Sequence, residues 1–169
     1  YTVTLTVTNQ NGTDTETKTD YITVSTFVPT YCHSQGNDPT DEYIQKVEIG
    51  SFSHTSGMTS YYDFTDFTVP LVAGLNYNVK LTPYYTGTIY TEYWKIYIDY
   101  NLDGDFEDAG EEVFSANGEH AQSGSFTVPS GLDVTTRMRV SMKYGSEQSG
   151  PCESFSYGEV EDYTVTISG

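Results

Sequence analysis

The segment Thr88-Ile-Tyr-Thr-Glu-Tyr-Trp-Lys-Ile-Tyr-Ile-Asp99 alternates with a period of two, so its side chains divide by parity between two faces of a strand. The more apolar face, which should lie in a core, carries Trp94, Ile96, Ile98 and Tyr100. The opposite face, which should point outward, carries Tyr93, Lys95, Tyr97 and Asp99. The pattern predicts a strand of a packed sheet.

The same period recurs along most of the chain. Residues 1–8 and 15–24 alternate on either side of the turn Asn9-Gln-Asn-Gly12, which predicts a β-hairpin. Further strands are expected at Tyr43–Ser51, Asp63–Val69, Tyr77–Pro83, Tyr90–Tyr100, Glu112–Phe114, Gly124–Val128, Thr136–Lys143 and Val160–Ile167. Because turn residues separate them at short intervals, the sequence favours an all-β fold, an antiparallel β-sandwich that is jelly-roll-like.

The charge balance narrows the classes of partner. The 169 residues include 24 Asp and Glu against 7 Lys and Arg, a formal net charge of −17. Binding to nucleic acid or to an anionic membrane surface depends on clustered cations, so both are disfavoured. Aromatic residues make up 15% of the chain, which argues for a folded domain and against disorder. We find no apolar run long enough for membrane insertion.

A change of composition at Thr26-Phe-Val-Pro-Thr30 predicts a domain boundary, with one unit at 1–26 and a second at 27–169. The first unit, Tyr1-Thr-Val-Thr-Leu-Thr-Val-Thr-Asn9 with Gly12 and Tyr21-Ile-Thr-Val24, resembles the last two strands of an immunoglobulin-like PKD-type domain. Two strands do not make a stable sandwich. Either the rest of that domain is missing from this chain, or the hairpin packs onto the second unit.

The two cysteines, Cys32 and Cys152, stand far apart and lack metal-site spacing. We expect a disulfide, which would restrict the unfolded chain by about 5 kcal/mol on the entropic model. The alternative is a pair of buried thiols. A disulfide would favour an exported protein, either secreted or on the cell surface.

The acidic stretch from Asp99 to Glu112 holds seven carboxylates and no basic residue. Oxygen side chains at its first, third and fifth positions, followed by Gly104, match the first half of a calcium loop. The second half departs from an EF-hand, because Gly110 stands where the bidentate Glu is expected. We therefore predict a calcium loop on a β scaffold, with the candidate ligands Asp99, Asn101, Asp103, Asp105, Asp108 and Glu111. The alternative is a solvated acidic turn.

Five of the seven basic residues fall on outward strand faces, opposite apolar residues such as Met138, Val140 and Met142. If their strands were neighbours, they would form a ligand platform of Tyr93, Tyr97, Lys80, Lys95, Arg137, Arg139 and Lys143. Rings of this kind can stack on sugars, and the cations can bind hydroxyls, carboxylates or sulfates. Alternatively, Arg137 and Arg139 pair across strands with acids at Glu159, Glu161 and Asp162.

An ordered set of motifs resembles the GEVED domain over residues 31–168. It comprises Tyr31-Cys32 with Ser34 and Gly36, Glu42-Tyr-Ile44 with Val47 and Gly50, Tyr62-Asp-Phe-Thr65, Ile98-Asp-Tyr-Asn101, Asp103-Gly-Asp-Phe106, Gly110-Glu111, Arg137-Met-Arg-Val140, Pro151-Cys152 and Gly158-Glu-Val-Glu-Asp-Tyr163. The resemblance implies an extracellular β-sandwich accessory module of secreted, multidomain bacterial proteins, found beside PKD-type repeats, peptidases and glycoside hydrolases. It also implies a metal site in the acidic loop, but no ligand and no catalytic residue.

Catalytic motifs are absent from the sequence. His33, His54 and His120 are scattered without an HExxH pairing, and no GxSxG elbow occurs. Carboxylates are numerous enough that counting alone does not exclude a glycosidase pair. We nevertheless expect a chain that is not an enzyme.

These observations predict a monomeric, calcium-stabilised carbohydrate-binding module that anchors a secreted hydrolase, with its catalytic domain elsewhere in the same parent chain, on a polysaccharide. The basic stripe favours an acidic or sulfated glycan, whereas the overall charge repels one. The alternatives are a protein-binding or adhesion module of a secreted peptidase, and a calcium-stabilised spacer.

Overall fold

The computed structural model describes residues 1–22 and 27–169, which form twelve strands and no helix. The first two strands, β1 (Val3–Asn9) and β2 (Gly12–Lys18), pair antiparallel with each other, with Asn9 opposite Gly12 at the turn. This confirms the predicted hairpin. All of its residues are exposed, so the structure does not show the alternative in which the hairpin packs onto the second unit. The prediction that the second strand runs to Val24 is wrong, because β2 ends at Lys18 and residues 19–22 are not in a strand. Val24 itself and the boundary at Thr26 fall outside the described residues.

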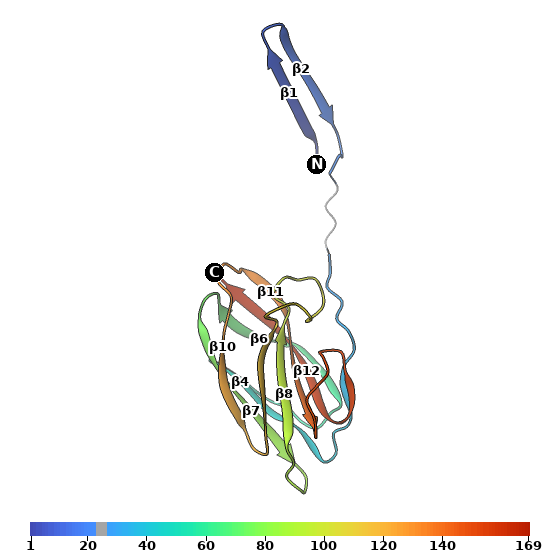
Figure 1. Cartoon of the computed structure of the whole chain (residues 1–169), viewed down its shortest axis with the longest axis vertical. Helices are drawn as coiled ribbons and strands as arrows, with labels where there is room; N and C mark the ends of the chain where they lie inside the picture. Colours follow the sequence, from blue (N-terminus) through green and yellow to red (C-terminus); the bar gives the residue numbers. More distant parts are fainter. Residues whose placement is uncertain (23–26) are drawn as a thin grey trace.

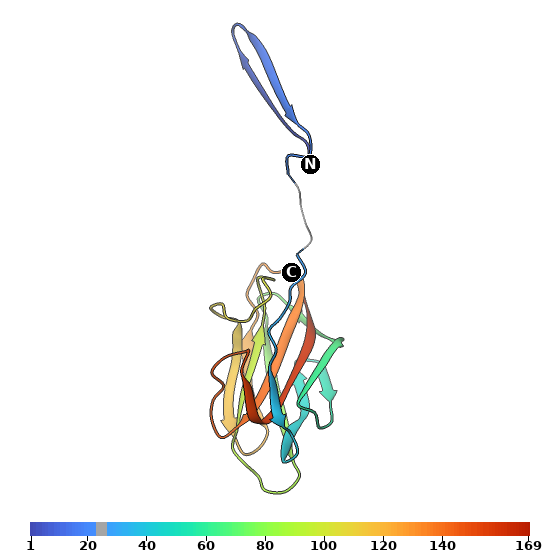
Figure 2. The same ribbon diagram turned by 90° about the vertical axis from the view of Figure 1, so that its right-hand side faces the viewer.

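The other ten strands form two sheets that lie face to face (Figure 1 and Figure 2). One sheet has the order β10-β7-β4-β5, and the other β3-β12-β11-β8-β9 with β6 also on β12. Their bounds are β3 Gln35–Asp38, β4 Glu42–Ile49, β5 Phe52–Thr55, β6 Tyr61–Val72, β7 Asn76–Tyr85, β8 Glu92–Ile98, β9 Glu112–Gly118, β10 Gln122–Thr127, β11 Val134–Tyr144 and β12 Ser154–Ser168. The predicted all-β sandwich is confirmed. Only β3 and β5, both four residues long, were not expected.

The long strand β12 departs from a purely antiparallel arrangement. It is antiparallel to β11 on one side, but on the other side it runs parallel to β3 at its start and to β6 along the rest. The crowded start of β12 requires glycine, because a Cβ on Gly36 would lie 1.9 Å from the carbonyl oxygen of Gly158. Gly158 itself has a φ of 117°, and a Cβ there would lie 2.1 Å from the carbonyl oxygen of Met142. The glycine that begins the Gly158–Tyr163 peptide therefore sets the spacing between three strands.

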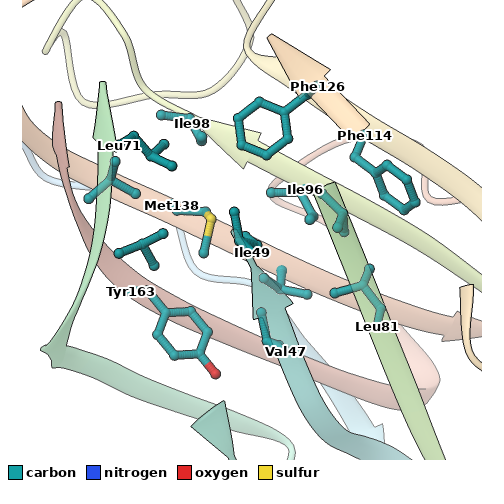
Figure 3. Close-up of a cluster of buried hydrophobic side chains, with 14 of the residues drawn as sticks. Val47, Ile49, Leu71, Leu81, Ile96, Ile98, Phe114, Phe126, Met138 and Tyr163 are labelled. Carbon is teal, nitrogen blue, oxygen red and sulfur yellow. The ribbon is translucent and has the colours of Figure 1, made fainter. Parts of the chain in front are cut away.

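The core lies between the sheets, and its members follow the predicted parity. Trp94, Ile96 and Ile98 of β8 are fully buried, as are Met138 and its alternate neighbours on β11. Figure 3 shows some of these side chains, such as Ile96 and Met138, in the same cluster as residues of the opposite sheet. The predicted core of these strands is confirmed.

Four buried glutamates occupy strand positions on the side that faces the core: Glu42 on β4, Glu92 on β8, and Glu159 and Glu161 on β12. Glu159 Oε2 accepts a hydrogen bond from the backbone N–H of Ile44 at 2.7 Å, next to an irregularity in the pairing of β4 with β7. Neither carboxyl oxygen of Glu92 has a partner among the described residues. Burial, and then the like charges of Glu42 and Glu161 respectively, raise the pKa of Glu92 to about 8 and that of Glu159 to about 9. Both side chains therefore carry a proton at neutral pH.

Glu159→Gln should stabilise the protein at alkaline pH. Folding raises the pKa of Glu159. The burial of this acid therefore does not reduce folding stability through ionisation below about pH 4.5, where it is protonated in both the folded and the unfolded protein. The loss of stability grows as pH rises toward the pKa of the folded state. Gln has nearly the same shape and does not ionise. We expect its melting temperature to exceed that of the parent by a few degrees at pH 8.5, and by less at pH 5.5. Thermal unfolding across this range measures the difference.

The exposed Glu119→Gln is the matched control and should show no such trend. A difference between Glu159→Gln and the parent that stays constant with pH would contradict a protonated Glu159.

Candidate metal loop and the cluster that anchors it

The acidic loop joins β8 to β9 without a helix on either side. Asn101, Asp103 and Asp105 each accept, through a side-chain oxygen, the backbone N–H of the residue two positions later, at 2.9–3.2 Å. The turn also needs positive φ angles, of 91° at Gly104 and 65° at Leu102. The predicted sharp turn at Gly104 is confirmed, and a leucine takes up a second left-handed position beside it.

Three exposed carboxylates converge on the outside of this loop. Asp103, Asp105 and Asp108 each offer a ligand oxygen, and these oxygens lie within 4.8 Å of one another. The side chain of Asn101 joins them, since its Nδ2 donates to Asp103 Oδ2 at 2.8 Å and to Asp108 Oδ2 at 2.5 Å. Four of the six predicted calcium ligands therefore lie together, in an arrangement that could bind a metal ion.

The other two predicted ligands, Asp99 and Glu111, are buried beneath the loop. Asp99 Oδ1 accepts the N–H of Leu102 at 2.6 Å, and its Oδ2 accepts the N–H of Gly104 at 3.2 Å. Glu111 Oε1 accepts the N–H of Tyr100 at 2.8 Å. In this conformation both carboxylates satisfy loop amides and lie apart from the three exposed aspartates. Asp99 and Glu111 therefore support the loop that presents the cluster.

The segment before the first cysteine holds the loop from the side. The hydroxyl of Tyr31 donates to Asp99 Oδ2 at 2.7 Å, and its ring stacks on Phe106 at 5.0 Å. The guanidinium of Arg137 lies 4.7 Å from the centre of the Tyr31 ring. Burial, and then the hydrogen bond to Asp99, raise the pKa of the Tyr31 hydroxyl. The sequence did not predict this role of Tyr31, and the one signal for it was the position of the tyrosine directly before Cys32.

Arg139 lies below Phe106 and is 1% exposed. Its Nε and Nη2 donate to the two oxygens of Asp162 at 2.8 Å each, and its Nη1 donates to the carbonyl of Pro151 at 2.8 Å. Arg137 Nη1 lies 3.5 Å from the same carboxylate. The alternative expectation, an arginine paired with an acid of the C-terminal strand, is thus confirmed. The prediction of Arg139 as an exposed ligand-binding residue is wrong.

The rest of the ligand platform does not form an open cationic surface either. β8 and β11 are neighbours, as supposed, but Lys80 lies on β7 in the other sheet. Tyr97 is 2% exposed and packs near Phe106, while Tyr93 is half-buried. Lys95 pairs with Glu112 and Glu147 at 3.0 and 3.1 Å, and Lys143 pairs with Glu153 at 2.7 Å. The alternation of residues predicted correctly which side chains share this face of β8 and β11. Other segments, however, cover the face and supply carboxylates that pair with its cations.

Cys32 and Cys152 form the predicted disulfide. The bond ties the Tyr31 segment to the loop that precedes β12, and Arg139 lies beside it, with Nη1 3.6 Å from the sulfur of Cys32. A disulfide fits an oxidising compartment.

No helix among the described residues is long and apolar enough to cross a membrane.

Arg139→Met should destabilise the protein by about 3–5 kcal/mol, because it leaves Asp162 buried without its main partner. The double variant Arg139→Met with Asp162→Leu should recover part of that loss, since no unpaired charge then remains. Denaturant unfolding of the single and double variants measures the coupling.

The control is Lys46→Met, which removes a half-exposed pair with Glu48 and should cost less than about 1 kcal/mol. A loss for Arg139→Met no larger than that of this control would show that the buried pair is not a major constraint.

Comparison with solved structures finds a distant likeness to the crystal structure of a CARDB domain from Pyrococcus furiosus in complex with di-metal ions. The TM-score is 0.37 at 8% identity, over 76% of this chain and 93% of that one. No curated protein matches the chain.

The model of one protein family matches residues 93–166, which include the acidic loop, both arginines of β11 and the peptide Gly158–Tyr163. That family is the GEVED domain, so the resemblance predicted over residues 31–168 is confirmed for residues 93–166.

Proposed function

We propose that the chain is a non-catalytic extracellular accessory module that binds Ca²⁺ through its acidic loop and binds a polysaccharide for a secreted hydrolase in the same parent chain. The observation that carries the calcium proposal is the convergence of three exposed carboxylates in one turn. Within the described residues, no Lys or Arg forms an ion pair with Asp103, Asp105 or Asp108. A bound cation would relieve their mutual repulsion.

The chemistry of these side chains favours calcium. The ligand atoms that converge, from Asp103, Asp105 and Asp108, are all carboxylate oxygens, and no histidine or cysteine belongs to the cluster. Hard cations prefer such ligands, whereas zinc and copper prefer nitrogen or sulfur. Calcium tolerates the irregular geometry of a flexible turn better than magnesium does.

A cation in the loop would also stabilise the sandwich. The loop is attached to Tyr31 through Asp99 and to Arg139 through Phe106. Ordering the loop would therefore strengthen contacts that hold the Cys32 segment against the larger sheet.

An exposed, stacked tyrosine supports the carbohydrate part of the proposal. Tyr62 is 50% exposed, and its ring stacks on Phe64. Rings fixed in this way offer flat apolar faces on which sugars can pack at little cost in side-chain entropy.

Chelation with EGTA should lower the melting temperature by about 5–10 °C relative to calcium at one hundred times its Kd, since that saturation adds about 2.7 kcal/mol of stability. Asp103→Ala and Asp105→Ala should abolish the response. Differential scanning calorimetry with and without CaCl₂ measures it, and MgCl₂ at the same concentration should stabilise less.

Glu119→Ala, an exposed acid outside the loop, should respond to calcium like the parent. Equal calcium responses in the parent and in Asp105→Ala would rule out a site in this cluster.

The polysaccharide proposal is tested by affinity electrophoresis on gels that contain neutral or sulfated polysaccharides. We expect retardation on at least one gel. Normal mobility on every gel, together with retention on a collagen-like protein, would replace the proposal with a protein-binding module.

A further inference from the structure

A groove opens at the edge of the sandwich where β5 and β6 face each other across the gap between the sheets. It has a volume of about 540 Å³ and is lined by His54, Thr55, Ser56, Gly57, Met58, Thr59, Tyr62 and Phe64. Sequence analysis missed it because β5 was not expected, although the aromatic density of residues 61–67 was a signal.

One wall of the groove is a fixed pair of aromatic rings. Tyr62 stacks on Phe64 with centroids 4.1 Å apart and planes inclined by 19°, and Tyr62 is 50% exposed. Phe64 in turn packs on Tyr163, which is completely buried in the core. The exposed ring is therefore held by its neighbour, and its orientation is set before any ligand arrives.

A bulge in β6 places a third aromatic ring beside the groove, against His54. The register on β12 jumps from Phe64 opposite Tyr163 to Thr68 opposite Thr164, so residues 65–67 leave the ladder. Asp63 Oδ1 accepts the N–H of Thr65 at 3.0 Å, which fixes the bulge. The bulge brings Phe67 over His54, with ring centroids 4.2 Å apart. Bulges commonly aim side chains toward functional sites in this way.

His54 supplies a polar atom within the aromatic wall. Its Nδ1 lies 3.0 Å from the hydroxyl of Tyr163, and that hydroxyl donates its only hydrogen to Glu161 Oε2 at 2.7 Å. With the Tyr163 hydroxyl donating to Glu161, we assign the ring proton of His54 to Nδ1, which leaves Nε2 as an acceptor. Burial lowers the pKa of His54, which favours the neutral ring. No described residue forms a hydrogen bond with Nε2.

The charge around the groove selects against anions. None of its lining residues is a Lys or Arg, and Asp63 and Asp66 belong to the strand that forms one wall. The chain as a whole has a formal charge of −17. An acidic or sulfated sugar would meet repulsion here, whereas a neutral sugar would not. Thr55, Ser56 and Thr59 line the groove, and the hydroxyls of Ser56 and Thr59, which donate to backbone carbonyls, keep acceptor lone pairs that suit a polyhydroxylated ligand better than an apolar peptide.

We infer that this groove is the sugar-binding site of the module and takes a neutral hexopyranose unit of a polysaccharide, an inference that rests on the proposed function. The pyranose ring packs on Tyr62, and one of its hydroxyl groups donates to Nε2 of His54. The stacked pair of Tyr43 and Tyr84 offers rings at a similar spacing, 4.9 Å, but neither ring lines this groove.

The experiment measures affinity for soluble neutral polysaccharides, namely xyloglucan, galactomannan and mixed-linkage β-glucan, with carrageenan as the sulfated probe. On the neutral polysaccharide that the parent binds best, Tyr62→Ala should raise the Kd about tenfold, the value of one good aromatic contact. Tyr62→Phe keeps the ring and should stay within about twofold. Tyr84→Ala, which removes a ring that is 41% exposed outside the groove, should bind like the parent. Circular dichroism and melting temperature confirm that each variant folds.

The outcomes separate this inference from the proposal on which it rests. Binding that survives Tyr62→Ala or that falls with Tyr84→Ala overturns the groove but leaves the polysaccharide-binding module intact. Binding to carrageenan alone overturns the preference for a neutral sugar. A parent that binds none of the four probes fails both proposals.

Discussion

The buried ion pair between Arg139 and Asp162 is the constraint on which the rest of this sandwich depends. Removing two charges from water is expensive, and the cost is offset only when every donor finds a partner. Here Arg139 uses both oxygens of Asp162, the carbonyl of Pro151 and the face of Phe106. Those partners belong to the last strand, to the residue before Cys152 and to the acidic loop. One side chain therefore requires three distant parts of the chain to meet at the same point.

That meeting point closes the outer face of the larger sheet. The Tyr31 segment, the disulfide and the acidic loop all lie over β8 and β11, and the lysines at their margins pair with glutamates. An open platform of rings and cations cannot exist on a face that is covered in this way. The features free to meet a ligand lie elsewhere, on the outside of the acidic loop and at the edge between β5 and β6.

Sequence periodicity predicted what depends on local geometry and missed what depends on long-range packing. The alternation around Trp94 identified the core face because the strand period is fixed. The spacing from Asn101 to Asp105 identified the acidic loop for a similar reason. Tyr97 and Arg139 are buried because segments that are remote in sequence cover them. The parallel pairing of β12 with β6 depends on the topology of the fold. The roles of Asp99 and Glu111 depend on which amides the loop leaves unpaired, and residue spacing does not show this.

The formal charge of −17 takes on a different meaning in the folded protein. Burial raises the pKa of Glu42 and Glu161 to about 7, that of Glu92 to about 8 and that of Glu159 to about 9. Several of these carboxyls are therefore partly or fully protonated near neutral pH, and the surface carries less negative charge than the composition states. Much of what remains lies in the acidic loop, where a bound cation would reduce it further. The groove presents His54 as a neutral acceptor, held by hydrogen bonds that run through Tyr163 to the buried acid Glu161. It can then bind an uncharged sugar without a strong electrostatic field acting against binding.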